Sequence, residues 1–205
     1  FLNALSGTYA YVKQHRVYFK AAIPFAIATL PGAILGSLVS DYFTGPTFSL
    51  SYGIFILIIS AIMYWNSSNK KAIATNFDET LFIARKKLGI ILSMFVGFIS
   101  SIFGIGGGII HVPVMIYALA FPPHMATATS HFVLAVSSFM GVTSHIFLNH
   151  IVWIPALTVG FGAVIGAQIG ARLSKKTKPR SIILLLCISL FLLGIRMIVE
   201  SNLLF

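Results

Sequence analysis

Apolar segments long enough to cross a lipid bilayer occupy most of this chain, and they constrain its fold more than any other feature. Hydrophobic residues make up 58% of the 205 residues, whereas charged residues make up only 9%. A soluble domain of this length carries far more surface charge, so the composition predicts an integral membrane protein. About 20 apolar residues cross the hydrocarbon core as a helix. The expected membrane segments are 1–12, 20–40, 47–65, 88–120, 124–148, 151–172 and 181–199.

The positive charges lie in three short connecting segments. Every Lys and Arg except Arg196 falls in, or at the edge of, the loops 13–20, 66–87 and 173–180. Short basic loops remain in the cytoplasm, so we expect these three loops to be cytoplasmic. The distribution of the charges behind the net charge of +10 therefore indicates how the chain is oriented in the bilayer. No nucleic acid is expected as a partner.

The same charge pattern requires the apolar segment 88–120 to break. The loop 66–87 is expected inside, and the turn 144–150, which has no Lys or Arg, is expected outside. Segment 124–148 makes one crossing between them, so 88–120 has to make either two crossings or none. One continuous helix is therefore excluded.

Glycines mark the place of the break. Glycine costs about 1 kcal/mol relative to alanine inside a helix. Four glycines lie close together here, and they are Gly104, Gly106, Gly107 and Gly108. We therefore predict two short helices, 88–103 and 107–120, that form a hairpin or re-entrant pair with the glycines at the turn.

The chain also repeats itself. The pattern Phe1-x-x-Ala4-x-Ser6 recurs 131 residues later, beginning at Phe132, and Gly32-Ala33-x-x-Gly36 recurs 130 residues later, beginning at Gly162. The charges make the two copies cross the bilayer in opposite directions. Inverted repeats with broken helices are typical of secondary transporters.

These patterns predict an all-α, polytopic transmembrane helical bundle with inverted repeats and broken half-helices at the glycine-rich turn. Residues 1–65 are expected to be the remainder of the first repeat, whose own broken element is missing. Residues 66–87 are expected to be a cytoplasmic basic linker, and residues 88–205 the second repeat.

A broken helix exposes amide N–H groups and the positive end of a helix dipole, and glycine lets an anion approach the backbone closely. The predicted substrate site therefore includes Gly104, Gly106, Gly107 and Gly108. The alternative is that these glycines only allow helices to pack closely.

Several side chains complete this candidate site. Thr129 and Ser130 can donate to an oxyanion, or they can bond to carbonyl groups of their own helix. Asn3 and Ser6 belong to the first repeat, correspond to the region of Ala135 to Ser138, and are placed at the same cavity. His111 and His131 are expected to be hydrogen-bonded packing residues rather than ligands.

The sequence shows no sign of a cofactor or metal centre. Cys187 is the single cysteine, and no acidic residue follows the glycine run at the spacing of a dinucleotide-binding motif. The leading interpretation is a transporter of a small anion, and the protein is not expected to be an enzyme. A metal-ion permease and an integral-membrane enzyme are the alternatives. The sequence leaves the oligomeric state open, with a homodimer among the options.

Residues 97–132 contain the glycine cluster, Pro113 and the run Ala126-Thr-Ala-Thr-Ser130, and this stretch resembles the TauE/SafE family of sulfite and organosulfonate exporters. The resemblance implies a multi-pass permease of a bacterial-type inner membrane that carries small sulfur-containing oxyanions. It also implies that an N-terminal copy of the glycine-rich element is missing from this chain.

Overall fold

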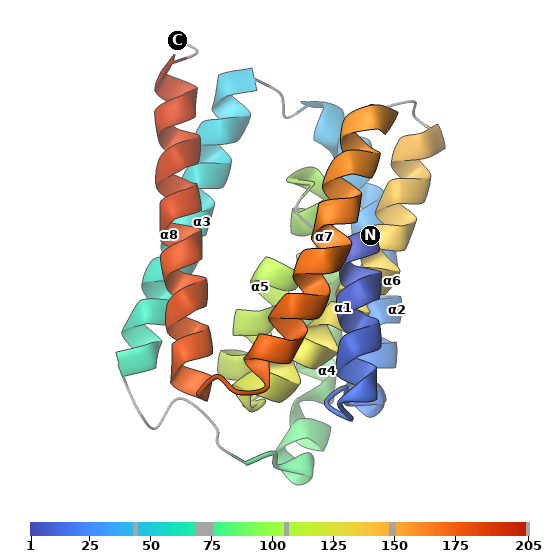
Figure 1. Ribbon diagram of the computed structural model, residues 1–205, viewed down its shortest axis with the longest axis vertical. Coiled ribbons are helices and arrows are strands. Elements are labelled where there is room, and N and C mark those ends of the chain that lie inside the picture. The colour runs from blue at the N-terminus through green and yellow to red at the C-terminus, as the bar shows by residue number, and fades with distance from the viewer. Residues whose placement is uncertain (43–44, 69–75, 105–106, 148–150, 204–205) are drawn as a thin grey trace.

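The chain folds into a bundle of helices (Figure 1) in a computed structural model that describes residues 1–42, 45–68, 76–104, 107–147 and 151–203. Within these ranges there are helices and no strand, which confirms the predicted all-α class. The elements are α1 (Leu2–Lys13), α2 (Phe19–Val39), η1 (Ser40–Tyr42), α3 (Gly45–Ser68), α4 (Glu79–Ile102), α5 (Gly108–Pro113), η3 (Val114–Ala118), α6 (Pro123–Phe147), α7 (Trp153–Ser174) and α8 (Pro179–Leu203). In the part of the chain that the structure describes, five helices are long and apolar enough to cross a membrane, and they belong to α2, α3, α6, α7 and α8.

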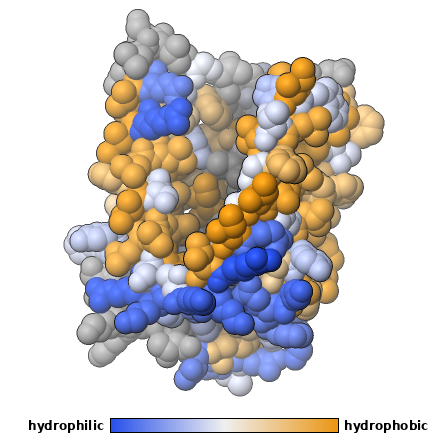
Figure 2. All heavy atoms as spheres, in the orientation of Figure 1, coloured by the Kyte–Doolittle hydropathy of each residue, from blue (hydrophilic) through white to orange (hydrophobic). Residues whose placement is uncertain are grey.

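The two halves of the chain run in opposite directions and interlock. In Figure 1, α2, α6 and α8 run upward, whereas α1, α3 and α7 run downward, as inverted repeats require. Helix α1 of the first half packs on α7 of the second, and α6 of the second half packs on α2 of the first. Helix α3 packs along α8. The three expected cytoplasmic connections all meet at the lower end, where Figure 2 shows a broad hydrophilic band.

The predicted break after α4 is confirmed. Helix α4 ends at Ile102, Gly104 has a φ of +64°, and the chain becomes helical again at Gly108. A positive φ is costly for residues other than glycine, so Gly104 allows the chain to turn there. From this turn the chain runs back as α5 and then as the π-helical turn η3.

The two arms of this hairpin differ in length more than predicted. Helix α4 begins at Glu79 rather than at residue 88, because the Asp78 carboxylate caps it and accepts hydrogen bonds from the amides of Thr80 (2.9 Å) and Leu81 (3.1 Å). The 24 residues of α4 extend for about 36 Å, so the three basic residues 85–87 lie on a helix and not in a loop. The helical part of the second arm ends at Ala118.

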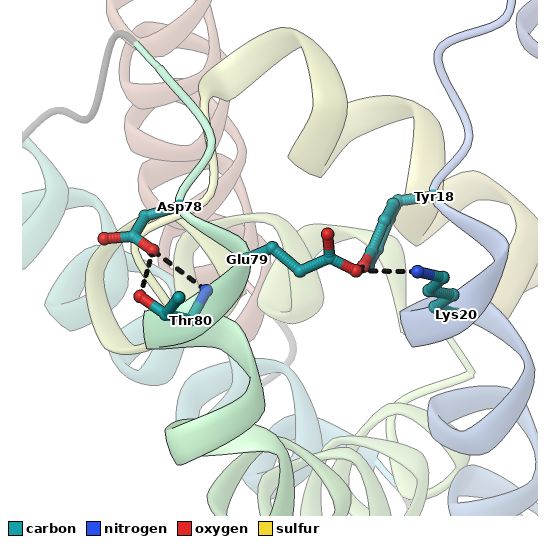
Figure 3. Close-up of polar contacts among 5 residues, drawn as sticks. All are labelled: Tyr18, Lys20, Asp78, Glu79 and Thr80. Atoms are coloured by element: carbon teal, nitrogen blue, oxygen red, sulfur yellow. Dashed lines mark hydrogen bonds and ion pairs between the residues drawn. The ribbon is translucent and has the colours of Figure 1, made fainter.

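Polar and aromatic contacts join α2 and α4 at the end that carries the basic connections. Figure 3 shows the Glu79 carboxylate between two donors, the Tyr18 hydroxyl at 2.9 Å and the Lys20 ammonium at 2.7 Å. The hydrogen bond from Lys20 is the main reason why the pKa of Glu79 lies below its ordinary value. The Tyr18 ring packs against Phe77, at 4.7 Å between ring centroids, and against Phe82, at 5.3 Å. Contacts around Tyr18 therefore hold the start of α2 against the start of α4.

Helices α2 and α4 touch at the level of their backbones. A Cβ atom on Gly32 would collide with the carbonyl oxygen of Met94, and one on Gly36 would collide with the carbonyl oxygen of Phe98. In a bilayer, small residues stabilise helix pairs by allowing this close approach. The contact fixes α4, and hence the turn that follows it, relative to α2.

Candidate functional site

A polar cavity lies beside the glycine-rich turn. Its volume is about 230 Å³, and it is bounded by the first turn of α1, the end of α4 and the second half of α6, with Ala33 of α2. The residues that line it are Phe1, Asn3, Ala4, Ala33, Ser100, Ser101, Gly104, Leu134, Ser137, Ser138, Gly141, Val142 and His145. Residues of four helices from different parts of the sequence therefore build one site.

The cavity lies in the half of the bundle away from the basic connections. On α6 its wall extends from Leu134 to His145, close to the end of that helix at Phe147. On α1 it involves the first residues, and the basic residue Lys13 is at the other end of that helix. The cavity therefore lies toward the opposite end of the bundle from Tyr18, which directly precedes α2.

The cavity wall combines apolar side chains with neutral polar side chains. Among the lining residues that the structure describes there is no Asp, Glu, Lys or Arg, and the polar groups are hydroxyls, an amide and an imidazole. Ser138 donates to the carbonyl of Leu134 at 2.6 Å, and Ser100 donates to that of Gly97 at 3.2 Å. A serine hydroxyl can rotate away from such a bond, because the helix does not depend on it. The wall can therefore present neutral donors to an anion.

Two of the predicted site residues, Asn3 and Gly104, line this cavity. Gly107 and Gly108 lie directly behind its wall. A Cβ on Gly107 would be 3.7 Å from the Ser100 hydroxyl, and one on Gly108 would be 3.1 Å from the side chain of Leu134. The predicted residue Gly106 lies outside the described residues.

The structure places the other three predicted site residues elsewhere. Thr129 is fully buried and accepts a hydrogen bond from the amide of Tyr18 at 3.1 Å. Ser130, also fully buried, donates to the carbonyl of Thr127 at 3.0 Å. Ser6 donates to the carbonyl of Val164 at 3.0 Å and so links α1 to α7. These three hydroxyls make contacts within the protein and do not line the cavity.

The sequence prediction missed most of the cavity's polar side chains, which are Ser100, Ser101, Ser137, Ser138 and His145. One signal was available, because both serine pairs stand inside long apolar segments. Ser137 also belongs to the internal repeat. The structure places it with Asn3 around one cavity, as the repeat suggested for that part of the chain.

The two histidines that were predicted to be packing residues lie inside the bundle. The Nδ1 atom of His131 is 3.2 Å from the carbonyl of Thr127, and the His131 ring packs edge-on against Tyr11. The ring of His111 packs near Phe25 and bonds to Ser93. Among the residues that the structure describes, no cluster of three or more His, Cys, Asp and Glu side chains is placed to hold a metal ion.

Known proteins similar to this chain are membrane transporters by name. The family model described as "Sulfite exporter TauE/SafE" matches residues 1–197. The probable membrane transporter protein YunE of Bacillus subtilis is 35% identical over 210 residues, which cover 97% of this chain and 77% of the relative. A probable membrane transporter protein of Xylella fastidiosa (strain Temecula1) is 27% identical, with 85% of this chain and 66% of the relative covered.

A third relative comes from an archaeon. The probable membrane transporter protein MJ0441 of Methanocaldococcus jannaschii is 26% identical, with 97% of this chain and 75% of the relative covered. The aligned part of the chain thus spans 66 to 77% of the length of these three relatives. No solved structure matches. The family match over nearly the whole chain shows that this protein belongs to the TauE/SafE family and is a membrane transporter.

Proposed function

We propose that this protein is a secondary transporter that exports a small sulfur-containing oxyanion, such as sulfite or an organosulfonate, by alternating access. The anion binds in the polar cavity, where Asn3 and the serine hydroxyls of α4 and α6 donate to it. Gly104 lines the cavity, and Gly107 and Gly108 lie behind its wall, where they leave room for Ser100 and Leu134. The family description, which names a sulfite exporter, supports this choice of substrate.

The observation that carries the proposal is the neutral, hydroxyl-rich wall of the cavity. An anion buried in a bilayer needs hydrogen-bond donors to replace its water, and hydroxyl and amide groups supply them. A metal cation prefers carboxylate, thiolate or several imidazole ligands. The described residues around the cavity offer one imidazole, that of His145.

The charge of the cargo favours export as the direction of transport. The cell interior is negative, so moving one negative charge outward releases about 2.3 kcal/mol per 100 mV. Export therefore requires no coupling cation. In this proposal the protein resides in the inner membrane with the connections 13–20, 66–87 and 173–180 in the cytoplasm, and the cavity is nearer the outer face.

The test is efflux of radiolabelled sulfite from liposomes that contain the purified protein. Ser138→Ala removes a donor from the cavity, and we expect about a tenfold rise in the apparent KM. Ser189→Ala is the matched control, because Ser189 is exposed on α8, and it should transport normally. Gly107→Leu should insert normally yet abolish flux, since its side chain would collide with Val96 and Ser100.

The same liposomes distinguish the competing functions. Flux of a sulfonate with no flux of Zn²⁺ supports the proposal. Zn²⁺ flux without sulfite or sulfonate flux would overturn it in favour of a cation permease. Normal sulfite flux in both Ser138→Ala and Gly107→Leu would show that the anion binds somewhere other than this cavity.

A further inference from the structure

His111 connects the two arms of the broken element. It lies on α5, is 1% exposed, and its Nε2 atom is 2.9 Å from the hydroxyl of Ser93 on α4. Ser93 is equally buried, and its hydroxyl lies 2.6 Å from the carbonyl of Gly89, one turn back along α4. A chain of three polar groups therefore runs from α5 into the backbone of α4.

This geometry selects one form of the imidazole. Ser93 has a single hydroxyl proton, and at 2.6 Å it is donated to the carbonyl of Gly89. The Ser93 oxygen can then accept a proton from Nε2 of His111. The opposite arrangement would break the bond to Gly89. It would also bury an unpartnered N–H on Nδ1, because Nδ1 of His111 has no hydrogen-bond partner among the residues that the structure describes. The neutral ring with its proton on Nε2 makes the larger number of hydrogen bonds.

The hydrogen bond lies where it can set the shape of the site. The amide of His111 donates to the carbonyl of Gly107 at 2.8 Å, so the residue that bonds to Ser93 also closes the first turn of α5. Gly107 in turn packs against Val96 and Ser100 of α4, and Ser100 lines the cavity. A shift of α5 along α4 would therefore change the cavity wall.

We propose that His111 is a positioning residue of the transport site. As the neutral Nε2–H tautomer it fastens α5 to α4 through Ser93, and it thereby holds the glycine turn against the polar cavity. The inference rests on the proposed function only in treating this cavity as the anion site. The tautomer and the fastening can be tested without any transport.

The direct test is ¹⁵N NMR of the histidine-labelled protein in detergent micelles. Each neutral tautomer and the charged ring give different patterns for the two ring nitrogens, and the signals missing from His111→Gln assign His111. We expect the Nε2–H pattern in the wild type and a mixture of tautomers in Ser93→Ala. An Nδ1–H or charged ring in the wild type, or unchanged His111 signals in Ser93→Ala, would overturn the proposal.

The second test uses two amides that differ in reach. Glutamine at position 111 places its N–H₂ group near the site of Nε2 and can still donate to Ser93, whereas asparagine ends near the site of Nδ1 and cannot. In sulfite efflux, we expect His111→Gln to keep a KM near that of the wild type. His111→Asn should raise KM about tenfold with little change in kcat. Equal behaviour of the two variants would refute a positioning role.

The two tests separate two kinds of failure. If the wild type moves no sulfite, the proposed substrate is wrong, and the NMR result still decides the state of His111. If His111→Asn does not fold, the comparison of the wild type with Ser93→Ala still tests the hydrogen bond.

Discussion

Helices α2 and α7 carry the same Gly-Ala-x-x-Gly pattern at equivalent places in the two repeats, but their surroundings differ. In the apolar stretch of α2 that is long enough to cross a membrane, 44% of the residues are buried inside the protein. In the corresponding stretch of α7, only 6% are. Gly32 and Gly36 of α2 lie against the backbone of α4. Around the place where a Cβ would stand on Gly162 or Gly166 of α7, the described part of the chain puts no atom of another helix within 4 Å.

The difference shows what a small-residue motif can and cannot do. Such a motif permits a second helix to approach, and it has no effect on packing until that helix is present. Helix α2 has α4 as its partner, and α7 contacts α1 on its opposite side. In a bilayer the uncovered face of α7 can rest against lipid chains, which are as apolar as its own side chains.

Because α2 and α7 run in opposite directions, their C-terminal ends should lie on opposite sides of the membrane. Thiol labelling of cysteines placed at these ends should show this difference completely. In a background that carries Cys187→Ser, Tyr42→Cys tests the chain just after α2, and Lys176→Cys tests the chain just after α7. Both side chains are exposed. An impermeant thiol reagent applied to intact cells should label position 42 and should label position 176 only after lysis. Labelling of both positions in intact cells would contradict inverted repeats.

The next largest effect is expected on stability, because Gly32 of α2 is tightly packed whereas Gly162 of α7 is not. Gly32→Ala places a methyl group on the carbonyl of Met94 and should lower stability by about 3 kcal/mol. Gly162→Ala meets open space inside a helix and should leave stability unchanged or raise it by up to about 1 kcal/mol, because alanine is the better helix former. Thermal unfolding in detergent measures both variants. A large loss in Gly162→Ala would mean that a further helix or a second copy covers this face of α7.

A smaller effect is expected at the contact that fastens α7 to α1. The side-chain amide of Gln168 donates to the carbonyl of Ser6 at 2.7 Å and is 2.9 Å from its hydroxyl. Gln168→Leu should therefore cost about 1–2 kcal/mol in the same unfolding measurement. The adjacent lipid-facing change Ile169→Leu is the control and should be nearly neutral. If Gln168→Leu is neutral too, apolar packing and the remaining hydrogen bonds, such as that from Ser6 to the carbonyl of Val164, are sufficient to hold α7 on α1.

The smallest expected effect is on the pH dependence of stability, and it arises from a difference between the starts of α2 and α7. Neither helix has a side-chain cap at its N-terminus, but at the start of α2 the Glu79 carboxylate bonds to Tyr18 and Lys20. The pKa of Glu79 is lower in the folded protein than its ordinary value of 4.5. Its contribution to folding stability is therefore present above pH 4.5 and is lost as the pH falls through the lower pKa of the folded protein.

We expect the thermal midpoint of Glu79→Gln to lie slightly below that of the wild type at pH 7. The two midpoints should converge as the pH falls below about 4.5. Glu200→Gln on α8 controls for the change in net charge. A constant difference between wild type and Glu79→Gln across this pH range would show that the ion pair does not stabilise the start of α2.

The sequence was sufficient for the membrane segments and for the break, because both depend on local properties. Length and apolarity determine the spans. The number of crossings that the basic loops require showed that segment 88–120 must break, and the clustered glycines located the break near Gly104. The start of α4 was missed by nine residues, since the basic residues 85–87 were assigned to a loop. Asp78, followed by Thr80, was the capping signal that would have corrected it.

The site was harder to predict because a serine in an apolar helix has several uses. Ser93 and Ser100 are seven residues apart and lie on the same side of α4. Ser93 is bonded to His111, whereas Ser100 lines the cavity. The distinction arises because α5 covers only part of α4, and that depends on contacts between distant segments. Thr129 was misplaced for a similar reason, since its partner Tyr18 is 111 positions away in the chain.

The absence of formal charge from the described cavity wall has an electrical consequence. If no side chain brings its own charge across the bilayer when the cavity changes sides, the only charge moved in each cycle belongs to the cargo. The current through a patch of membrane divided by the number of molecules transported would then give the valence of the transported species. Such a recording could distinguish a monovalent sulfonate from divalent sulfite without any chemical analysis of the cargo.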